Sequence, residues 1–86
     1  MSNNIYQALS ELEKNHKPAA LCTLIKSEGS TPRHVGSKML VYEDGKFIGT
    51  VGGGDLEHRV LDEAWMAISE GKPRIVSYTL SNPKTW

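Results

Sequence analysis

The stretch 49–57, GTVGGGDLE, joins a strand-like segment to a helix-like segment. Three consecutive glycines at such a junction allow backbone angles that other residues avoid. They also leave the first amides of the following helix uncovered, where free N–H donors and the positive end of the helix dipole favour an anionic group. The stretch therefore predicts either the wall of a binding site or a tight turn that needs small residues to pack.

Size and charge limit the classes of protein that this sequence fits. The chain has 86 residues, enough for one small domain, and its ten basic residues balance its ten acidic residues. This balance argues against a nucleic-acid or anionic-membrane partner. No apolar run approaches the roughly 20 residues that span a bilayer. A core this small favours a homo-oligomer.

The single cysteine and the start of the chain bear on its compartment. Cys22 has no partner for an internal disulfide, and residues 1–4, MSNN, lack the features of a signal peptide. We therefore expect a cytoplasmic protein. Cys22 lies within an apolar run, which favours a small core residue over a reactive one.

Hydrophobic periodicity predicts an α+β domain over residues 1–86, with a mixed sheet, a β-hairpin and two packed helices. A strand covered on both faces is expected where the apolar run is nearly continuous. Proline and glycine mark the ends of the helices. In the order α-β-β-β-α-β, the expected elements are a helix at 4–15 stopped by Pro18, a buried strand at 19–27, a hairpin at 37–51, a helix at 56–70 stopped by Gly71, and a strand at 74–80.

The hairpin has a well-defined turn signal. Asp44-Gly45 is a favoured pair for a two-residue type I′ turn. That turn predicts a register with one opposite-charge pair and two apolar pairs across the strands. The expected pairs are Glu43 with Lys46, Tyr42 with Phe47, and Val41 with Ile48.

One charged residue breaks the apolar pattern of the second helix. On a helical wheel the apolar residues share one half of the circle, and Glu57 lies near the centre of that half. A carboxylate directed toward a core is costly unless it is paired or hydrogen-bonded. Glu57 therefore either lines a pocket formed with the glycines or, as a first-turn residue, only complements the helix dipole. The apolar half contains Leu56, Val60, Leu61, Ala64, Trp65, Ala67 and Ile68.

Asp55 and two basic residues complicate an anion site at the glycines. If Asp55 caps the helix, its carboxylate satisfies the amides that an anion needs. A phosphate then requires other donors, for which Arg33 and Lys38 are candidates because they flank the other glycine-containing loop. If the two loops meet at one edge of the sheet, these cations face the glycines; otherwise both are ordinary solvated charges.

Several familiar motifs are absent from this sequence. Residues 49–54 have the Walker spacing, but Asp55-Leu56 stands where Lys-Ser/Thr is required, and G-x-G-x-x-G is missing. The three histidines show no metal-ligand spacing, so a metal site is not expected. No Ser-His-Asp or Cys-His arrangement follows from the spacing, and the lack of a nucleophile–base pair argues against an enzyme.

Three motifs in order resemble the N-terminal domain of the XdhC/CoxI family. They are residues 28–33 (EGSTPR), 36–39 (GSKM) and 49–57 (GTVGGGDLE). The likeness covers roughly residues 15–80. Members of this family are maturation factors for molybdenum hydroxylases such as xanthine dehydrogenase. The resemblance thus implies an accessory, chaperone-type protein and not an enzyme: a module that binds molybdenum cofactor (molybdopterin) transiently and delivers it to the hydroxylase apoenzyme.

The resemblance also implies a set of cofactor-binding residues. Many relatives have Cys at the position of Asp55, which places a direct sulfur-transfer role in question. Typical members continue into a Rossmann-like domain that is absent from this sequence, so a Rossmann-like partner chain is expected to complete the site. The candidate residues are Ser30, Thr31, Pro32, Arg33, Gly36, Lys38, Gly52, Gly53, Gly54, Asp55 and Glu57.

Three functions remain compatible with the sequence. The first is a module that binds and delivers molybdenum cofactor without turnover. The second is an enzyme acting on a phosphorylated nucleotide-like ligand, with Glu57 as general base and Arg33 or Lys38 as electrophile. The third is a structural subdomain in which the glycines serve packing and a sheet edge mediates dimerisation.

Overall fold

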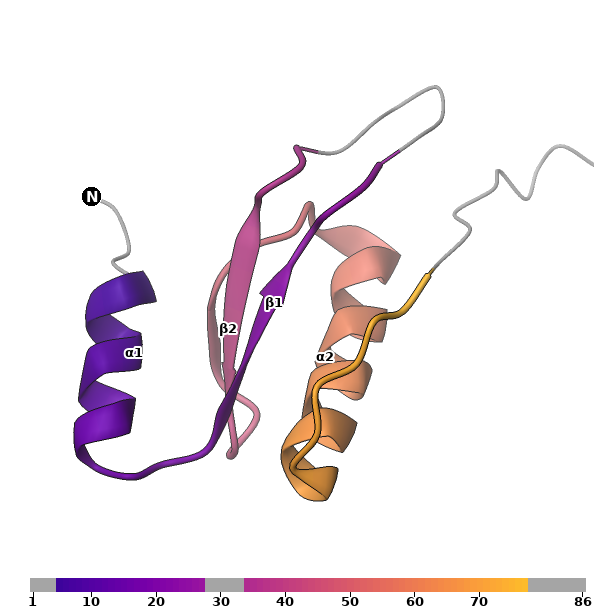
Figure 1. Ribbon diagram of the computed structural model, residues 1–86. Coiled ribbons are helices and arrows are strands. Elements are labelled where there is room, and N and C mark those ends of the chain that lie inside the picture. Colours follow the sequence, from indigo (N-terminus) through magenta and orange to yellow (C-terminus); the bar gives the residue numbers. More distant parts are fainter. Residues whose placement is uncertain (1–4, 28–33, 78–86) are drawn as a thin grey trace, which may run out of the picture.

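The computed structural model describes residues 5–27 and 34–77. These residues form two helices and three strands, which confirms the α+β class (Figure 1). In chain order they are α1 (Ile5–Lys14), β1 (Ala19–Thr23), β2 (Lys38–Tyr42), β3 (Phe47–Gly49) and α2 (Gly54–Glu70). None of the described helices is long and apolar enough to cross a membrane.

The strands form one sheet in the order β1-β2-β3, and both neighbouring pairs are antiparallel. Helix α1 lies on one face of the sheet and α2 on the other (Figure 1). The sheet was expected to be mixed, but that expectation depended on a final strand, and the three described strands include no parallel pair.

The core lies between the central strand β2 and helix α2. Met39 and Val41 alternate along β2 and pack in one cluster with Val51, Leu56 and Ala64. Leu40 is 0% exposed and points to the other face of the sheet, which α1 covers. The central strand is therefore buried on both faces, and it separates two small apolar layers.

Helix α1 ends through a backbone turn. His16 adopts a positive φ of 55°, and the Lys17 amide donates to the Leu12 carbonyl at 2.9 Å. This left-handed residue and its hydrogen bond reverse the chain before Pro18. The expected stop at Pro18 thus holds in position, but His16 is the residue that terminates the helix.

The hairpin forms at the expected place, but the predicted register is wrong by one residue. Val41 faces Phe47, and Leu40 faces Ile48. The turn has three residues, and its last residue, Gly45, has a φ of 93°. A three-residue loop with a left-handed glycine accommodates one more residue than a type I′ turn.

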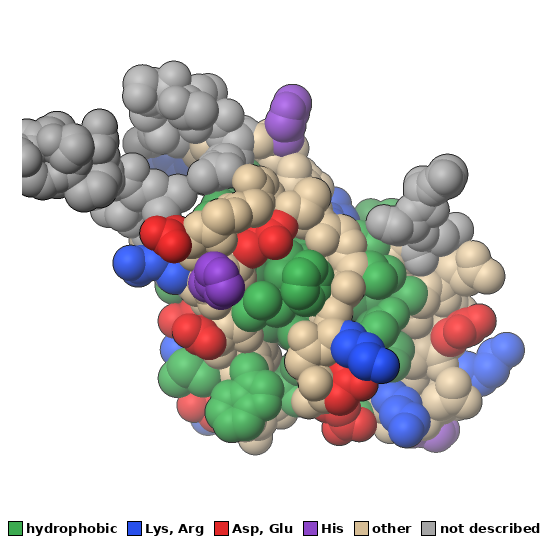
Figure 2. All heavy atoms as spheres, turned by 180° about the vertical axis from the view of Figure 1, so that it is seen from behind, with side chains coloured by type: hydrophobic (Ala, Val, Ile, Leu, Met, Phe, Trp, Pro, Cys, Tyr) green, Lys and Arg blue, Asp and Glu red, His purple; other side chains and the backbone are tan. Residues whose placement is uncertain are grey.

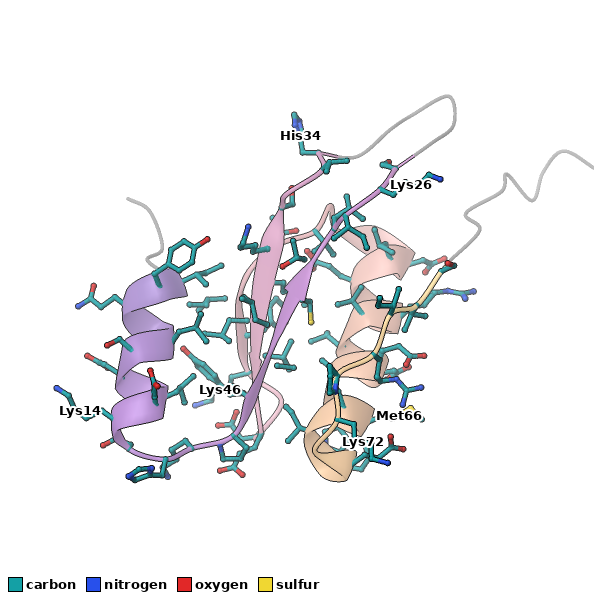
Figure 3. All side chains as sticks on the ribbon, in the orientation of Figure 1. Lys14, Lys26, His34, Lys46, Met66 and Lys72 are labelled. Carbon is teal, nitrogen blue, oxygen red and sulfur yellow. The ribbon has the colours of Figure 1, made fainter. Side chains whose placement is uncertain are left out.

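This change of register moves side chains to the opposite face of the sheet. Phe47 shares the α2 face with Val41, instead of the α1 face with Tyr42. Lys46 lies on the α1 side (Figure 3). The carboxylate of Asp44 accepts a hydrogen bond from the Lys46 amide at 2.9 Å, which stabilises the observed turn.

Strand β1 is shorter and more exposed than the sequence predicts. It ends at Thr23, and Leu21 is 41% exposed. Ala20 and Cys22 pack against the core on the α2 side. Among the described strands β1 lies at an edge of the sheet, so its residues are only partly covered, and the expectation of burial on both faces is wrong.

Helix α2 matches the predicted segment and begins two residues earlier than predicted. Its end is confirmed at Gly71, which adopts a left-handed conformation (φ 70°, ψ 27°) and donates its amide to the Ala67 carbonyl at 2.8 Å. Trp65 was assigned to the apolar half of the helix, but it is 57% exposed. Trp65 lies at the edge of the apolar half of the helical wheel, next to the polar half.

The segment after α2 does not form the expected strand within its described residues, 74–77. Arg74 instead contacts α2, with its Nε 2.8 Å from Glu63 Oε1 and its Nη1 3.3 Å from Glu70 Oε1. Ile75 is 87% exposed. Residues 78–80 of the expected strand lie outside the described residues. The alternating pattern is present in the sequence, but no strand in the described sheet pairs with these four residues.

Exposed apolar side chains also occur on the face opposite the view of Figure 1. Figure 2 shows hydrophobic side chains open to solvent there, with acidic, basic and histidine side chains around them. Phe47 of β3 is 41% exposed and Met66 of α2 is 39% exposed. Met66 points away from the sheet (Figure 3).

Candidate functional site

Two loops meet at one end of the sheet. The Thr50 amide, which follows β3, donates to the Lys38 carbonyl at the start of β2 at 3.1 Å. The Lys38 ammonium donates to the Gly36 carbonyl at 3.1 Å. The segment that precedes β2 and the segment that follows β3 are therefore neighbours, as a shared site requires. We call the residues Thr50–Gly54 and Glu57 the glycine corner.

Gly53 and Gly54 of the glycine corner are not required for packing. A Cβ added at either residue would meet no atom within 4 Å. Both residues have positive φ, 80° at Gly53 and 65° at Gly54, and Gly52 has a φ of 130°. These glycines therefore serve the conformation of the backbone, and space remains open beside two of them.

Gly49 has a different role from the glycines that follow it. A Cβ there would collide with the Lys38 carbonyl oxygen and lie 3.0 Å from Ile5 Cδ1 of α1. Its φ of 83° is also unfavourable for other residues. Gly49 is thus a structural glycine that lets α1, β2 and the end of β3 approach closely.

Glu57 is half-buried and belongs to a hydrogen-bond network within the glycine corner. Its Oε2 accepts from the Thr50 hydroxyl and from the Gly53 amide, the latter at 3.2 Å. The Thr50 oxygen in turn accepts from the Gly52 amide at 3.0 Å. These contacts provide the hydrogen bonds that a carboxylate near the apolar face needs.

The start of α2 is capped in an unusual way. The N-cap is Gly53, and no side chain makes a cap hydrogen bond there, so Asp55 is not the cap. Asp55 is exposed, and both Asp55 and Glu57 lie in the first turn. Because the amides of Gly52 and Gly53 donate within the corner, an anion at this helix end would depend on other donors.

Of the two expected basic residues, the structure describes Lys38 but not Arg33. Alternation along β2 puts Lys38 on the same face as Leu40, the α1 side, whereas Glu57 reaches the corner from α2. Four candidates, Ser30, Thr31, Pro32 and Arg33, lie outside the described residues. Within the described segments, the structure thus brings Glu57 together with Gly52 and Gly53, and Lys38 with Gly36.

Other residues at this end were not identified from the sequence. Lys26 and His34 lie at the same end of the sheet, on either side of the loop that links β1 to β2 (Figure 3). Thr50 is the more informative addition, because its hydroxyl contacts both Glu57 and Gly52. The sequence signal for Thr50 was its hydroxyl group, two positions before Gly52 and seven positions before Glu57.

Metal and thiol chemistry receive no support within the described residues. No group of three or more His, Cys, Asp or Glu side chains among them is arranged to hold a metal ion. Burial of Cys22 raises the pKa of its thiol, which disfavours the thiolate form that reacts. Cys22 packs against the core cluster, as a small core residue does.

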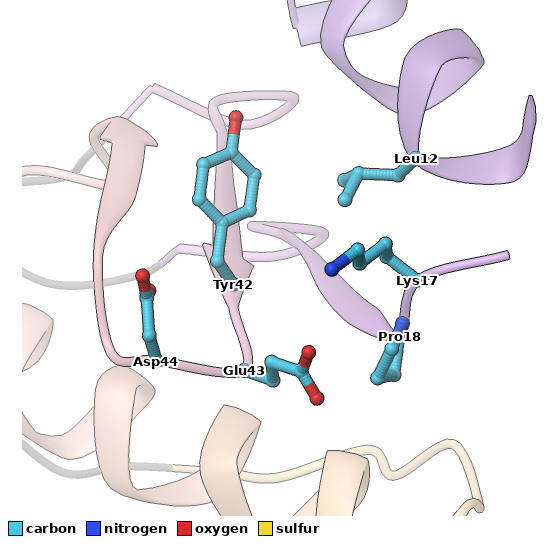
Figure 4. Close-up of a pocket in the computed structure, with 6 residues that line it drawn as sticks. All are labelled: Leu12, Lys17, Pro18, Tyr42, Glu43 and Asp44. Carbon is cyan, nitrogen blue, oxygen red and sulfur yellow. The ribbon is translucent and has the colours of Figure 1, made fainter. Parts of the chain in front are cut away.

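A small hollow lies at the opposite end of the sheet (Figure 4). Its volume is about 210 Å³, below the roughly 300–1,000 Å³ of typical ligand pockets. It lies beside the last residue of β2, whereas the glycine corner lies beside the first. The lining residues are Leu12, Lys17, Pro18, Tyr42, Glu43 and Asp44.

Comparison with known proteins identifies the family. The profile of the XdhC and CoxI family matches residues 12–79, which include the end of α1, the three strands and α2. This chain belongs to the XdhC and CoxI family.

Two curated relatives come from Escherichia coli (strain K12). The chain is 43% identical over 72 residues to the uncharacterized protein YqeB, a match that covers 84% of this chain and 13% of YqeB. It is 36% identical over 67 residues to the molybdenum cofactor insertion chaperone PaoD, with 78% of this chain and 21% of PaoD covered. The chain therefore spans less than a quarter of the length of either relative.

Proposed function

We propose that this chain binds molybdenum cofactor and assists its delivery to a molybdenum hydroxylase during maturation of that enzyme. Membership of the XdhC and CoxI family supports this role. So does the relative PaoD, which is named as a molybdenum cofactor insertion chaperone. In this proposal the cofactor is cargo, and the chain does not turn it over.

The observation that carries the proposal is the open backbone of Gly53 and Gly54 beside the Glu57 carboxylate. Without side chains in the space next to these glycines, a flat ligand can approach the peptide plane. Glu57 offers acceptor oxygens for the N–H groups of a pterin. The terminal phosphate of the cofactor then pairs with cations, for which we propose Arg33 and, from the α1 side of the same end of the sheet, Lys38.

The remaining candidates complete the proposed cargo site. Ser30, Thr31 and Pro32 precede Arg33 in the loop between β1 and β2, and Gly36 follows it. Gly36 is tied to Lys38 by a hydrogen bond, and Asp55 lies in the first turn of α2. Asp55 lacks a thiol, so we propose holding and transfer of the intact cofactor, without direct sulfur chemistry at this position.

Equilibrium binding tests the proposal. The purified chain is titrated with molybdenum cofactor released from a purified molybdenum hydroxylase, and pterin fluorescence reports the bound fraction. We expect Glu57→Gln and Arg33→Ala each to weaken binding by about tenfold or more, since each removes a charge-assisted hydrogen bond. The matched control is Glu70→Gln, at the far end of the same helix. Equal affinity of all four proteins would show that the site is elsewhere.

Maturation in cells tests delivery separately from binding. In cells that lack this gene, we expect molybdenum hydroxylase apoprotein to accumulate with less cofactor and less activity. Xanthine dehydrogenase is the client that we propose to assay first. Normal cofactor content of the hydroxylase in such cells would contradict a delivery role.

A second candidate is a subdomain that mediates assembly, and exposed apolar side chains favour it. Trp65 is 57% exposed and Phe47 is 41% exposed. We propose that such residues contact another chain, either a Rossmann-like partner or a second copy. Light scattering of the purified chain, compared with a Trp65→Ser variant, tests self-association. A monomer at all concentrations would exclude the second copy.

A further inference from the structure

We propose that Thr50 is a positioning residue of the glycine corner. Its hydroxyl holds the Glu57 carboxylate and the Gly52–Gly53 peptide in the arrangement that receives cargo. This inference rests on the proposed function, and it adds to that function a residue outside the expected binding set.

The Thr50 hydroxyl both donates and accepts a hydrogen bond. It donates to Glu57 Oε2 and accepts from the Gly52 amide at 3.0 Å. One hydroxyl supplies a single donor and two acceptor positions, so its only proton is committed to the carboxylate. Glu57 Oε2 also accepts from the Gly53 amide at 3.2 Å. Thr50 thus closes a ring of hydrogen bonds through the loop and the first turn of α2.

The Thr50 backbone is anchored to the sheet. Its amide donates to the Lys38 carbonyl at 3.1 Å, which continues the pairing between β2 and β3. A β-branched side chain has few rotamers, so its hydroxyl has a defined direction once the backbone is fixed. Thr50 therefore connects the rigid sheet to the loop that follows it.

The loop that precedes α2 needs such a connection because its backbone conformation is unfavourable by itself. Gly53 has φ 80° and ψ −177°, a conformation that only glycine adopts readily. Such a conformation persists when the surrounding contacts determine it. The hydrogen bonds of Thr50 and Glu57 to the loop amides are contacts of this kind, and removing the Thr50 hydroxyl takes one hydrogen bond from the carboxylate and one from the Gly52 amide.

Side-chain substitutions separate the hydroxyl from the shape of Thr50. Thr50→Val keeps the volume and removes the hydroxyl, and Thr50→Ser keeps the hydroxyl. We expect Thr50→Val to weaken binding of released molybdenum cofactor by about tenfold, and Thr50→Ser to bind within about twofold of the wild type. Thr23→Val is the matched control, because Thr23 also pairs with Lys38 in the sheet. Melting temperatures confirm that each variant is folded.

A double mutant tests whether Thr50 acts through Glu57. If it does, Thr50→Val combined with Glu57→Gln binds no more weakly than Glu57→Gln alone. Independent, additive losses would overturn the positioning role. So would wild-type affinity in Thr50→Val while Glu57→Gln is impaired.

Hydrogen exchange of the Gly52 and Gly53 amides tests the geometry without cargo. We expect both amides to exchange about tenfold faster in Thr50→Val than in the wild type or Thr50→Ser. If the wild-type chain binds no cofactor, the proposed function fails, and this measurement still decides the inference. Unchanged exchange in Thr50→Val would overturn it.

Discussion

The absence of a Cβ atom at Gly49 lets three elements, α1, β2 and the end of β3, approach one another closely. A side chain there would meet the Lys38 carbonyl of β2 and Ile5 of α1, in a backbone conformation that favours glycine. Gly53 and Gly54 have positive φ as well, but open space lies beside them. The same residue type therefore supports packing at one position and access at the next.

We expect Gly49→Ala to lower the free energy of unfolding by about 3 kcal/mol, from backbone strain and the steric collision together. Urea denaturation followed by circular dichroism measures this change. The control is Gly71→Asn, because Gly71 is left-handed but no atom lies within 4 Å of an added Cβ, and asparagine tolerates that conformation. Equal stability of the two variants would contradict the close approach at Gly49.

Cys22 gives a prediction for alkaline pH. Burial raises the pKa of its thiol above the ordinary value of 9.0, so the folded chain keeps a proton that the unfolded chain releases. Its contribution to stability is complete below the unfolded pKa and is lost as pH rises through the folded pKa.

The free energy of unfolding should therefore fall more steeply above pH 9 in the wild type than in Cys22→Ala. The extra slope is at most about 1.4 kcal/mol per pH unit, the value for a single proton. Urea denaturation at several pH values measures both slopes. Parallel slopes would mean that the thiol titrates normally in the folded chain.

At the scale of elements, the hairpin shows what the sequence specifies and what it leaves open. Asp44-Gly45 located the turn, and the alternating apolar residues located both strands. The register depended on whether the loop has two or three residues, and both choices place apolar residues opposite each other. The hydrogen bond from the Lys46 amide to Asp44 and the left-handed Gly45 belong to the three-residue choice.

Gly45 therefore tests the turn. We expect Gly45→Val to destabilise the fold by about 1–2 kcal/mol, because β-branched residues avoid positive φ, and Gly45→Asn to cost about 0.5 kcal/mol or less. Thermal unfolding measures both. Nuclear Overhauser contacts between Val41 and Phe47 in the wild type would confirm the register, whereas contacts between Tyr42 and Phe47 as facing residues would support the type I′ alternative.

The two helices differ in how completely the sequence defined them. The end of α2 followed from a local signal, the glycine at position 71, whereas the end of α1 was assigned to Pro18 and is formed by His16. The exposure of Trp65 was not local, because it depends on how far the sheet extends beneath α2. The predicted final strand does not form over residues 74–77, also for a reason that is not local. A strand needs a partner strand, and Arg74 instead forms ion pairs with Glu63 and Glu70 of α2.

At the scale of the whole molecule, the sequence identified two loops that form a shared site if they meet, but it did not show which hydrogen bonds connect the residues of the glycine corner. The sequence left open whether the loop with Gly36 and Lys38 meets the residues after β3, and the hydrogen bond from the Thr50 amide to the Lys38 carbonyl shows that the two segments are neighbours. Thr50 was missed because its role depends on the three-dimensional direction of one hydroxyl. The apolar arc marked Glu57 correctly as an exception, and its partners became evident only in the structure.

The hollow beside Tyr42 provides an internal comparison for the cargo site. It lies at the end of the sheet away from the glycine corner, and most of its lining residues are exposed. A ligand that binds non-specifically has no reason to prefer one end. We therefore predict where the cofactor binds, at the glycine corner, as well as how tightly it binds.

Chemical-shift mapping with isotope-labelled chain and released molybdenum cofactor tests that claim most directly. We predict that the largest shifts occur at Gly52, Gly53, Gly54 and Glu57, with smaller shifts at Lys38 and none at Tyr42 or Glu43. Saturable shifts confined to the Tyr42 end, or no shifts at cofactor concentrations that load a molybdenum hydroxylase, would contradict the account.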